Sequence, residues 1–500
     1  MKLTSKSATL IAPVALIFAL TATPAVAASS PKSGIVAAYT LVVPSSTAKS
    51  HLQARAVIPN RISCPRVKMT YSSGKKSEAA MTMRVPGATT GPAFAALRAC
   101  QANLPSGLSY ASVGAIDVPA KFQSKFDKIA VFGDTGCRVT AKQVQDCNTP
   151  AAWPLARNAQ SVAAAKPDVI FFTGDFFYRE AACPADKLAF CGASPAPAIP
   201  PAAGQKFAPI SDTDYGWVAD TLIPMAPAFA AAPILVTRGN HESCFRGGNG
   251  WMMMFEIKLK ADSCAPTAAG ASAPNNIAPT YSVDFPIASG RKLRAIMVDS
   301  NAGSNSGITP AWQALQKPAY EQANKLASTQ KGIEPWLITH RPMFGIDDVN
   351  QFDKPDPSAT PPDPGELNWT SIDQTGAALG LTSRFNLMLA SHVHVAQVVQ
   401  MPGQPAQVIF GNGGSVPDST NPADYATPAY GPLNTPAGQP IDPAYPPINQ
   451  LPSYVWTKIK YGHAIFTPSA KVGQWSISQR DTGGKQFAAC TAVGKKFTCK

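Results

Sequence analysis

The sequence has few histidines, no cysteine pairs of the CxxC type and, after its first twenty residues, no apolar run that could cross a membrane. The missing CxxC pairs exclude the common structural zinc sites built from cysteines. The missing apolar runs exclude a protein with several membrane spans. Only 6 of the 500 residues are histidine, so any clustering among them is informative. No internal repeat is present.

The N-terminus has the features of an export signal. Lys2 and Lys6 supply a positive start, residues 8–20 form an apolar stretch, and residues 25–27 (AVA) form a small-x-small cleavage site. An uncleaved anchor is disfavoured because the apolar stretch is shorter than the ~20 residues that a span requires. We therefore predict a signal peptide at residues 1–27, no membrane attachment after cleavage, and a periplasmic or secreted location.

The cysteines are consistent with export. There are 10, and the simplest pairing joins neighbours along the chain, although the sequence allows other connectivities. Disulfides persist in oxidising compartments. The predicted pairs are Cys64/Cys100, Cys137/Cys147, Cys183/Cys191, Cys244/Cys264 and Cys490/Cys499.

The formal charge of +13 predicts attraction of anions. Removal of the signal takes away two lysines and leaves 13 − 2 = +11. Such a field raises the local concentration of anionic substrates. The basic residues are scattered and no nucleic-acid-binding motif occurs, so a small anionic substrate is favoured over nucleic acid.

Alternating strand and helix patterns predict an α/β fold after residue 125. Residues 28–125 contain short strand-like runs and are predicted to form a small β-rich N-terminal domain. Residues 126–480 are predicted to form the main domain, and residues 481–500 a disulfide-closed tail. Ligands of such sheets bind beyond the carboxyl ends of the strands. The apolar strand-like runs are 129–132, 169–173, 234–237, 293–298, 336–339, 386–390 and 408–410, and the helical stretches are 151–165, 215–229 and 309–328.

Two long proline-rich segments interrupt the main domain. Residues 347–366 and 416–452 hold many of the 48 prolines. Long loops of this kind are commonly functional lids or inserts. We expect them to open or close the pocket and so to decide between substrates.

Polar clusters follow the apolar runs, and four of the six histidines lie in them. Aspartate, tyrosine, asparagine and histidine together suit iron, zinc or manganese rather than calcium. Seven donors suit two metals, and a shared carboxylate can bridge metals ~3.5–4 Å apart. The clusters are Gly133-Asp134-Thr135-Gly136, Gly174-Asp175-Phe176-Phe177-Tyr178, Gly239-Asn240-His241-Glu242, Thr339-His340-Arg341-Pro342 and Ser391-His392-Val393-His394.

This series resembles the calcineurin-like metallophosphoesterases and, within them, the purple acid phosphatases. The family pattern GDxG, GDxxY, GNH[DE], VxxH, GHxH runs here from Asp134 to His394. Most calcineurin-like enzymes have a histidine two residues after the first aspartate, where this chain has Gly136. In exchange, Tyr178 stands where the purple enzymes have their tyrosine. The resemblance implies a metallophosphoesterase β-sandwich flanked by helices, following the N-terminal β-rich domain.

The resemblance also implies a set of ligands and a reaction. A metal-bound hydroxide would attack phosphorus while His241 assists the leaving oxygen. The first metal, Fe(III), would be held by Asp134, Asp175, Tyr178 and His394; the second, Fe(II), Zn(II) or Mn(II), by Asp175, Asn240, His340 and His392.

The chain departs from the family pattern at three places. Ser391 replaces the glycine of GHxH, Leu337 replaces the valine before the fourth cluster, and no histidine lies between His340 and His392. A further substrate histidine of plant and animal members is therefore absent. Arg341 is our candidate to replace it, with Asn240 and His241 as the other substrate-binding residues.

We predict an acid-phosphatase-type hydrolase of small phosphate monoesters. One alternative is a phosphodiesterase or pyrophosphate or nucleotide hydrolase of the same fold, and another is a non-catalytic secreted protein that binds metal or phosphate.

Taken singly, Asp134 and Asp175 could be turn residues and Asn240 a helix cap. His463 is predicted to be structural. Disulfides at Cys137 and Cys244 would restrain two of the loops that carry the candidate ligands.

Overall fold

This computed structural model describes residues 34–45, 51–84, 96–140, 143–181, 183–191, 212–244, 246–257, 277–287, 290–301, 310–328, 330–345, 380–418 and 453–500. The predicted signal peptide, the segment 347–366 and residues 419–452 lie outside the described residues. In the part of the chain that is described, no helix is long and apolar enough to cross a bilayer.

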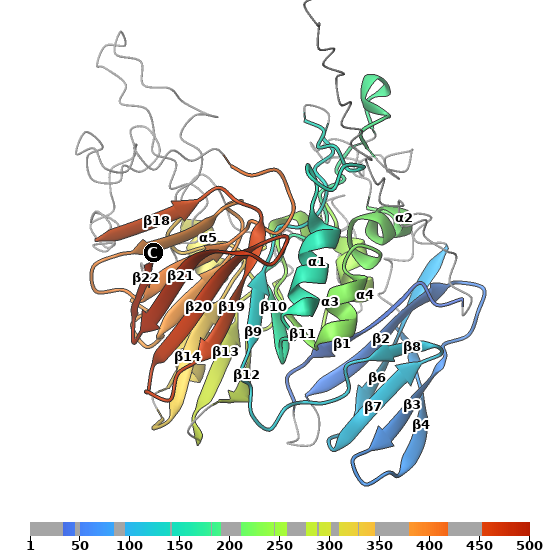
Figure 1. The fold of residues 1–500 in the computed structure, drawn as a ribbon, viewed down its shortest axis with the longest axis horizontal. Coiled ribbons are helices and arrows are strands. Elements are labelled where there is room, and N and C mark those ends of the chain that lie inside the picture. Colours follow the sequence, from blue (N-terminus) through green and yellow to red (C-terminus); the bar gives the residue numbers. More distant parts are fainter. Residues whose placement is uncertain are drawn as a thin grey trace, which may run out of the picture.

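Two large β-sheets pack against each other and form the centre of the molecule (Figure 1). Their shared core includes Val131 and Phe171 from one sheet and Trp336 and Leu389 from the other. The larger sheet has 11 strands, in the spatial order β22 (Lys496–Cys499), β21 (Gln486–Val493), β20 (Gln474–Asp481), β19 (Gly462–Pro468), β9 (Ile129–Phe132), β10 (Val169–Phe172), β11 (Ile234–Val236), β1 (Ala37–Val42), β2 (Leu52–Pro59), β6 (Leu97–Leu104) and β5 (Thr82–Arg84).

The second large sheet also carries site loops. It contains parallel pairs β13–β14, β14–β15 and β15–β17, and its other pairs are antiparallel. The 7 strands are, in order, β12 (Tyr281–Pro286), β13 (Lys292–Met297), β14 (Ile333–Ile338), β15 (Leu387–Ala390), β17 (Ala406–Phe410), β16 (Ala396–Gln400) and β18 (Tyr454–Lys458).

The apolar runs form strands because they are buried on both faces. Every residue of β9, β10, β11 and β15 is buried, and the pairs β9–β10 and β10–β11 are parallel. Continuous apolar sequence is typical of parallel strands that are covered on both sides. The predicted strands and the predicted sandwich are therefore confirmed.

Helices cover the outer faces of both sheets (Figure 1). The outer core of the larger sheet packs Phe132 and Phe172 against Leu155, Phe229 and Trp251 of the helices. The helices of the larger sheet are α1 (Leu155–Ala164), α2 (Asp214–Trp217), a π-helical turn (Val218–Leu222), α3 (Ala226–Ala231) and α4 (Gly248–Met254); α5 (Pro310–Leu326) covers the other sheet, and short 3-10 turns lie at Ala185–Lys187 and Asn240–Glu242.

The N-terminal strands extend the large sheet. β1 pairs in parallel with β11, and Arg55 of β2 donates to the carbonyl oxygens of Met254 (2.9 Å) and Glu256 (3.0 Å). This anchors the end of α4, which follows the third polar cluster. A separate 4-stranded sheet joins β4 (Lys76–Ala80), β3 (Arg66–Tyr71), β7 (Leu108–Val113) and β8 (Ile116–Val118).

The C-terminal strands also belong to the large sheet. Cys490 on β21 lies opposite Cys499 on β22, and the two form a disulfide. Hydrogen bonding between strands therefore continues across the expected boundaries near residues 125 and 480, and the division into domains stays a prediction.

Four of the predicted disulfides are confirmed. They are Cys64–Cys100, Cys137–Cys147, Cys183–Cys191 and Cys490–Cys499. Cys244 is also disulfide-bonded, and its predicted partner Cys264 lies outside the described residues.

Candidate metal centre

Loops from both sheets meet at one end of the sandwich. Asp134 follows β9, Asp175 follows β10 and Asn240 follows β11, whereas His340 follows β14 and His392 follows β15. Parallel neighbours place their carboxyl ends at the same edge, so these loops converge. One inter-sheet contact is the backbone hydrogen bond from Gly133 N to Phe410 O (2.9 Å).

Three of the predicted ligands have a left-handed backbone. The φ angles are 54° at Asp134, 56° at Asp175 and 76° at His392. Such conformations cost about 1–3 kcal/mol each for a residue other than glycine, and they cluster at functional sites. The conformation at His392 is stabilised because its N–H donates to Asp134 Oδ2 (2.9 Å).

The first donor group joins Asp134, Asp175 and His394, whose ligand atoms lie within 4.8 Å of one another. The hydroxyl of Tyr178 lies at its centre, 2.8 Å from Asp134 Oδ1, Asp175 Oδ2 and His394 Nε2. All four side chains are buried. The four residues that the sequence assigns to the first metal are thus brought together.

The second donor group joins Asp175, His340 and His392, also within 4.8 Å. Asn240 Oδ1 lies 2.8 Å from His340 Nε2, which in turn lies 3.2 Å from His392 Nδ1 and 3.2 Å from Asp175 Oδ2. Asp175 belongs to both groups. A shared carboxylate is the arrangement that a dinuclear centre requires.

Gly136 packs against the backbone of residues 176–178 and against the Tyr178 ring. A Cβ added at Gly136 would lie 2.7 Å from Tyr178 N and 2.9 Å from Tyr178 Cδ2, closer than van der Waals contact permits. A histidine at position 136 is therefore incompatible with this placement of Tyr178. The loop that carries Tyr178 therefore leaves no room for a side chain at position 136.

Glu242 holds two of the loops that carry candidate ligands, those after β10 and β11, through hydrogen bonds. Its buried carboxylate accepts hydrogen bonds from the backbone N–H groups of Asp175, Phe176, Phe177 and Gly239, at 2.8–3.1 Å. These groups would otherwise be buried donors without acceptors, which costs free energy. The acidic residue of the third cluster is thus a positioning residue.

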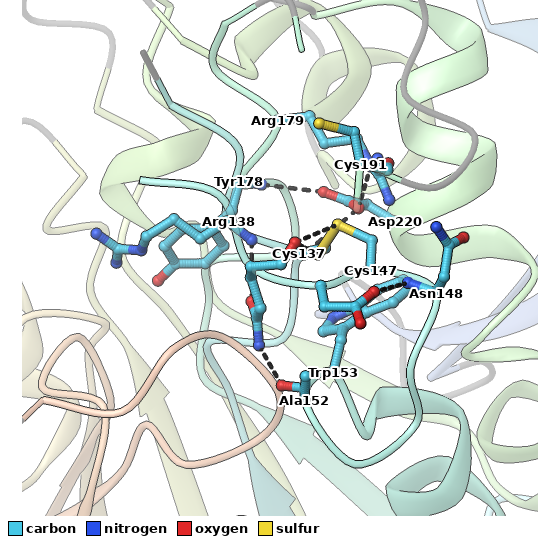
Figure 2. The surroundings of a disulfide bond; sticks show 12 residues. Cys137, Arg138, Cys147, Asn148, Ala152, Trp153, Tyr178, Arg179, Cys191 and Asp220 are labelled. Carbon is cyan, nitrogen blue, oxygen red and sulfur yellow. Dashed lines mark hydrogen bonds and ion pairs between the residues drawn. A yellow bond between two sulfur atoms is a disulfide. The ribbon is translucent and has the colours of Figure 1, made fainter. Parts of the chain in front are cut away.

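A second buried carboxylate holds in place the loop after β10 that carries Tyr178, here called the tyrosine loop (Figure 2). Asp220, in the π-helical turn, accepts from Tyr178 N (3.1 Å) and Cys137 N (3.4 Å) and pairs with Arg179 (2.5 Å). Cys137 is joined to Cys147. The disulfide, Asp220 and Arg179 together connect the first and second clusters.

His340 is oriented by the loop of the other sheet. Its Nδ1 lies 2.9 Å from the carbonyl oxygen of Thr173, so it donates there and leaves Nε2 for the centre. Ser391 Oγ donates to the same carbonyl (2.6 Å) and lies 3.0 Å from His340 Nδ1. The left-handed residue of this loop is His392 and not Ser391, so serine in place of the family glycine creates no backbone strain.

His241 lies beside the centre and contacts a carboxylate outside it. Its Nδ1 lies 2.6 Å from Glu180 Oε1, and its Nε2 lies 3.7 Å from Asp175 Oδ2. Arg246 pairs with Glu180, and its Nη2 lies 2.8 Å from the His241 ring nitrogens. Burial and then Arg246 lower the pKa of His241 to about 4.

The donors fit cations rather than a neutral polar core. Burial, then Asp134 and Asp175, raise the pKa of Tyr178, so its proton remains when no cation is present. Against the opposing effect of burial, Asp418 and Asp134 raise the pKa of His394 to about 9. A bound cation would replace these protons, and metal binding should therefore release protons.

Several residues of the site were not predicted from the sequence. Glu180 and Arg246 contact His241, and Ser300 Oγ accepts from the backbone N–H groups of His340 (3.2 Å) and Arg341 (2.9 Å). Ser300 follows β13 closely, so the same search for polar residues after strands could have found it. Nothing in the local sequence indicates the roles of Glu180 and Arg246.

His463 lies away from the centre and has a structural partner. Its Nδ1 lies 2.8 Å from Asn158 Oδ1, and both side chains are buried. The structural interpretation of this histidine is confirmed.

The sequence model of the calcineurin-like phosphoesterases matches residues 127–395. This is more than half of the chain, and the protein belongs to that family. No curated protein matches the sequence.

Two solved structures have a similar fold. Purple acid phosphatase PPD1 from yellow lupin (Lupinus luteus) seeds has 13% identity and a TM-score of 0.50, covering 91% of this chain and 74% of its own. PhoD has 10% identity and a TM-score of 0.52, covering 93% of this chain and 91% of its own. At these identities the likeness concerns the fold. Family and donor groups together define a phosphoesterase with sites for two metal ions.

Proposed function

We propose that this protein hydrolyses phosphate monoesters in the manner of an acid phosphatase. The observation that supports this proposal is the pair of donor groups that share Asp175, with His241 beside them. Metal ions bound there would lower the pKa of water and offset the negative charge of the phosphate.

His241 is the proposed proton donor. Its Nδ1 faces Glu180, so Nε2 is the nitrogen directed toward Asp175 and the centre. Glu180 and Asp175 favour the protonated ring, whose Nε2 would give a proton or a hydrogen bond to the leaving oxygen. Asn240 and Arg341 would contact the phosphate, and Arg341 Nη1 lies 2.9 Å from His392 Nε2.

We propose Fe(III) at the group with Tyr178 and Fe(II), Zn(II) or Mn(II) at the other. The support is the phenol oxygen, a hard donor placed between two carboxylates and an imidazole. The purified protein should be purple and contain about two metals per chain. A colourless protein with two metals would exclude the iron–tyrosine assignment and leave the phosphoesterase proposal intact.

We also propose that the protein acts outside the cytoplasm on a small phosphorylated substrate. Four disulfides support the location, because such bonds persist in oxidising compartments. The net charge of +13, or +11 without the predicted signal peptide, supports an anionic substrate.

The test compares three substrates with wild type and H241A. Wild type should cleave an alkyl phosphate faster than bis(p-nitrophenyl) phosphate or pyrophosphate. H241A should lose about 10²–10⁴-fold in kcat on the alkyl phosphate while keeping its metals. Preference for the diester or pyrophosphate would favour the alternative hydrolase. Metal-loaded wild type that cleaves none of them would favour a non-catalytic binding protein.

A further inference from the structure

Arg138 lies at the centre without an assigned role. Its Cζ is 5.0 Å from the ring centroid of Tyr178, and its Nη2 is 3.4 Å and 3.5 Å from the two ring nitrogens of His394. Figure 2 shows the side chain alongside the Tyr178 ring, extending away from the disulfide of Cys137. Arg138 therefore contacts two predicted ligands of the first metal.

Arg138 forms no direct ion pair among the described residues, and the carboxylate whose pKa its charge helps to lower, Glu180, is already paired with Arg246. The neighbouring arginines differ, because Arg179 pairs with Asp220 and Arg246 pairs with Glu180. The Nε of Arg138 is buried and has no hydrogen-bond partner in the described part of the chain. A guanidinium beside a metal centre that has a buried, unpaired donor and no carboxylate of its own is better satisfied when an anion binds there.

Contact with Tyr178 does not use the hydrogen-bonding capacity of Arg138. A cation over an aromatic ring is attracted to the ring face, which explains where the guanidinium lies. Nη2 also contacts His394, whereas Nη1 has no hydrogen-bond partner in the described part of the chain and is the nitrogen left for a ligand. The planar fork of the guanidinium matches the oxygen atoms of a phosphate group.

A second arginine lies beside the other donor group. Arg341 Nη1 is 2.9 Å from His392 Nε2, just as Arg138 Nη2 is close to His394. His392 belongs to one donor group and His394 to the other. Each half of the centre therefore has one guanidinium next to its histidine.

We propose that Arg138 binds a phosphoryl oxygen of the substrate together with Arg341, and that this pair selects monoesters over diesters. The inference rests on the proposed phosphatase function. A monoester presents three terminal oxygens and up to two negative charges, whereas a diester presents two oxygens and one charge. A site with two guanidinium groups in addition to two metals is therefore matched to the monoester.

The first test measures binding of inorganic phosphate, by calorimetry, to the protein purified with its own metals. R138Q should bind phosphate about 10- to 100-fold more weakly, as expected for loss of a hydrogen bond to a charged group. R138K should recover part of the affinity. The matched control is R157Q, which removes the same charge from an exposed position on α1 and should leave affinity unchanged.

The second test measures the ratio of kcat/KM for p-nitrophenyl phosphate to that for bis(p-nitrophenyl) phosphate. R138Q should lower this ratio about tenfold. The proposal is overturned if R138Q binds phosphate as tightly as R157Q, or if R138Q loses its metals, since Arg138 would then support the ligands instead. If wild type cleaves neither ester but phosphate binding depends on Arg138, the phosphatase function fails and the phosphate site stands.

Discussion

The Cys137–Cys147 disulfide should hold metal ligands in addition to stabilising the fold. A matched comparison is available in the same chain, because this pair is separated by 10 residues and Cys490–Cys499 by 9. The first pair lies beside Gly136 and the tyrosine loop, and the second joins β21 to β22. The perturbation is replacement of each pair by alanine.

The two replacements should cost nearly the same stability. Loop-closure entropy gives about 2.7 kcal/mol for the 10-residue separation and about 2.6 kcal/mol for the 9-residue separation. The assay is urea denaturation of the metal-free protein, with the other disulfides intact. Both double variants should shift to lower urea by a similar amount.

The two double variants should differ in their affinity for metal. The freed loop around Cys137 must be ordered again when a metal binds, and fixing one residue costs roughly 1–2 kcal/mol. C137A/C147A should therefore bind metal about tenfold more weakly in a chelator competition. C490A/C499A should bind as wild type does. Equal affinity in both variants would refute the view that the disulfide positions the ligands.

Three further predictions concern single side chains. E180Q should lower turnover of an alkyl phosphate about 10- to 100-fold but that of p-nitrophenyl phosphate little, because His241 matters most for poor leaving groups; equal losses would contradict the role of Glu180. Y178F should abolish the visible absorption band of the proposed purple centre. It should also lower the affinity for the first metal by more than the ~10–100-fold typical of residues that only support ligands. Burial and then Arg480 lower the pKa of His463 to about 3, below its ordinary 6.5, so its contribution to stability is present above pH 6.5 and is lost as pH falls toward 3. Between pH 7 and 4, wild type should lose roughly 3 kcal/mol that H463Q does not lose, as measured by urea denaturation at both pH values; identical losses would contradict this account.

The convergence of the candidate donors could be predicted from the sequence because they lie in short polar clusters that follow buried strands. Asp134 after β9 and His392 after β15 are local features, and the family pattern adds their order. The disulfides were predictable for the same reason, since each confirmed pair joins neighbours along the chain.

The remaining features depend on contacts between distant segments. The parallel pairing of β1 with β11 joins Leu41 to Ile234, and no local pattern encodes it. The contact of Arg138 with His394 likewise joins loops of different sheets. Side chains of this kind are recognised only when the folded loops are placed together.

The conflict between position 136 and Tyr178 restricts how this centre could have evolved. A side chain at position 136 would meet the backbone of residues 176 and 178 as well as the Tyr178 ring, so a histidine ligand can be gained only if this loop also moves. Loss of the tyrosine side chain alone would not open position 136, because the backbone contacts would remain. A substitution at either position alone would therefore disturb the loop or remove a donor. Each ligand arrangement should therefore persist within its own lineage, and the two positions should change together when sequences are compared.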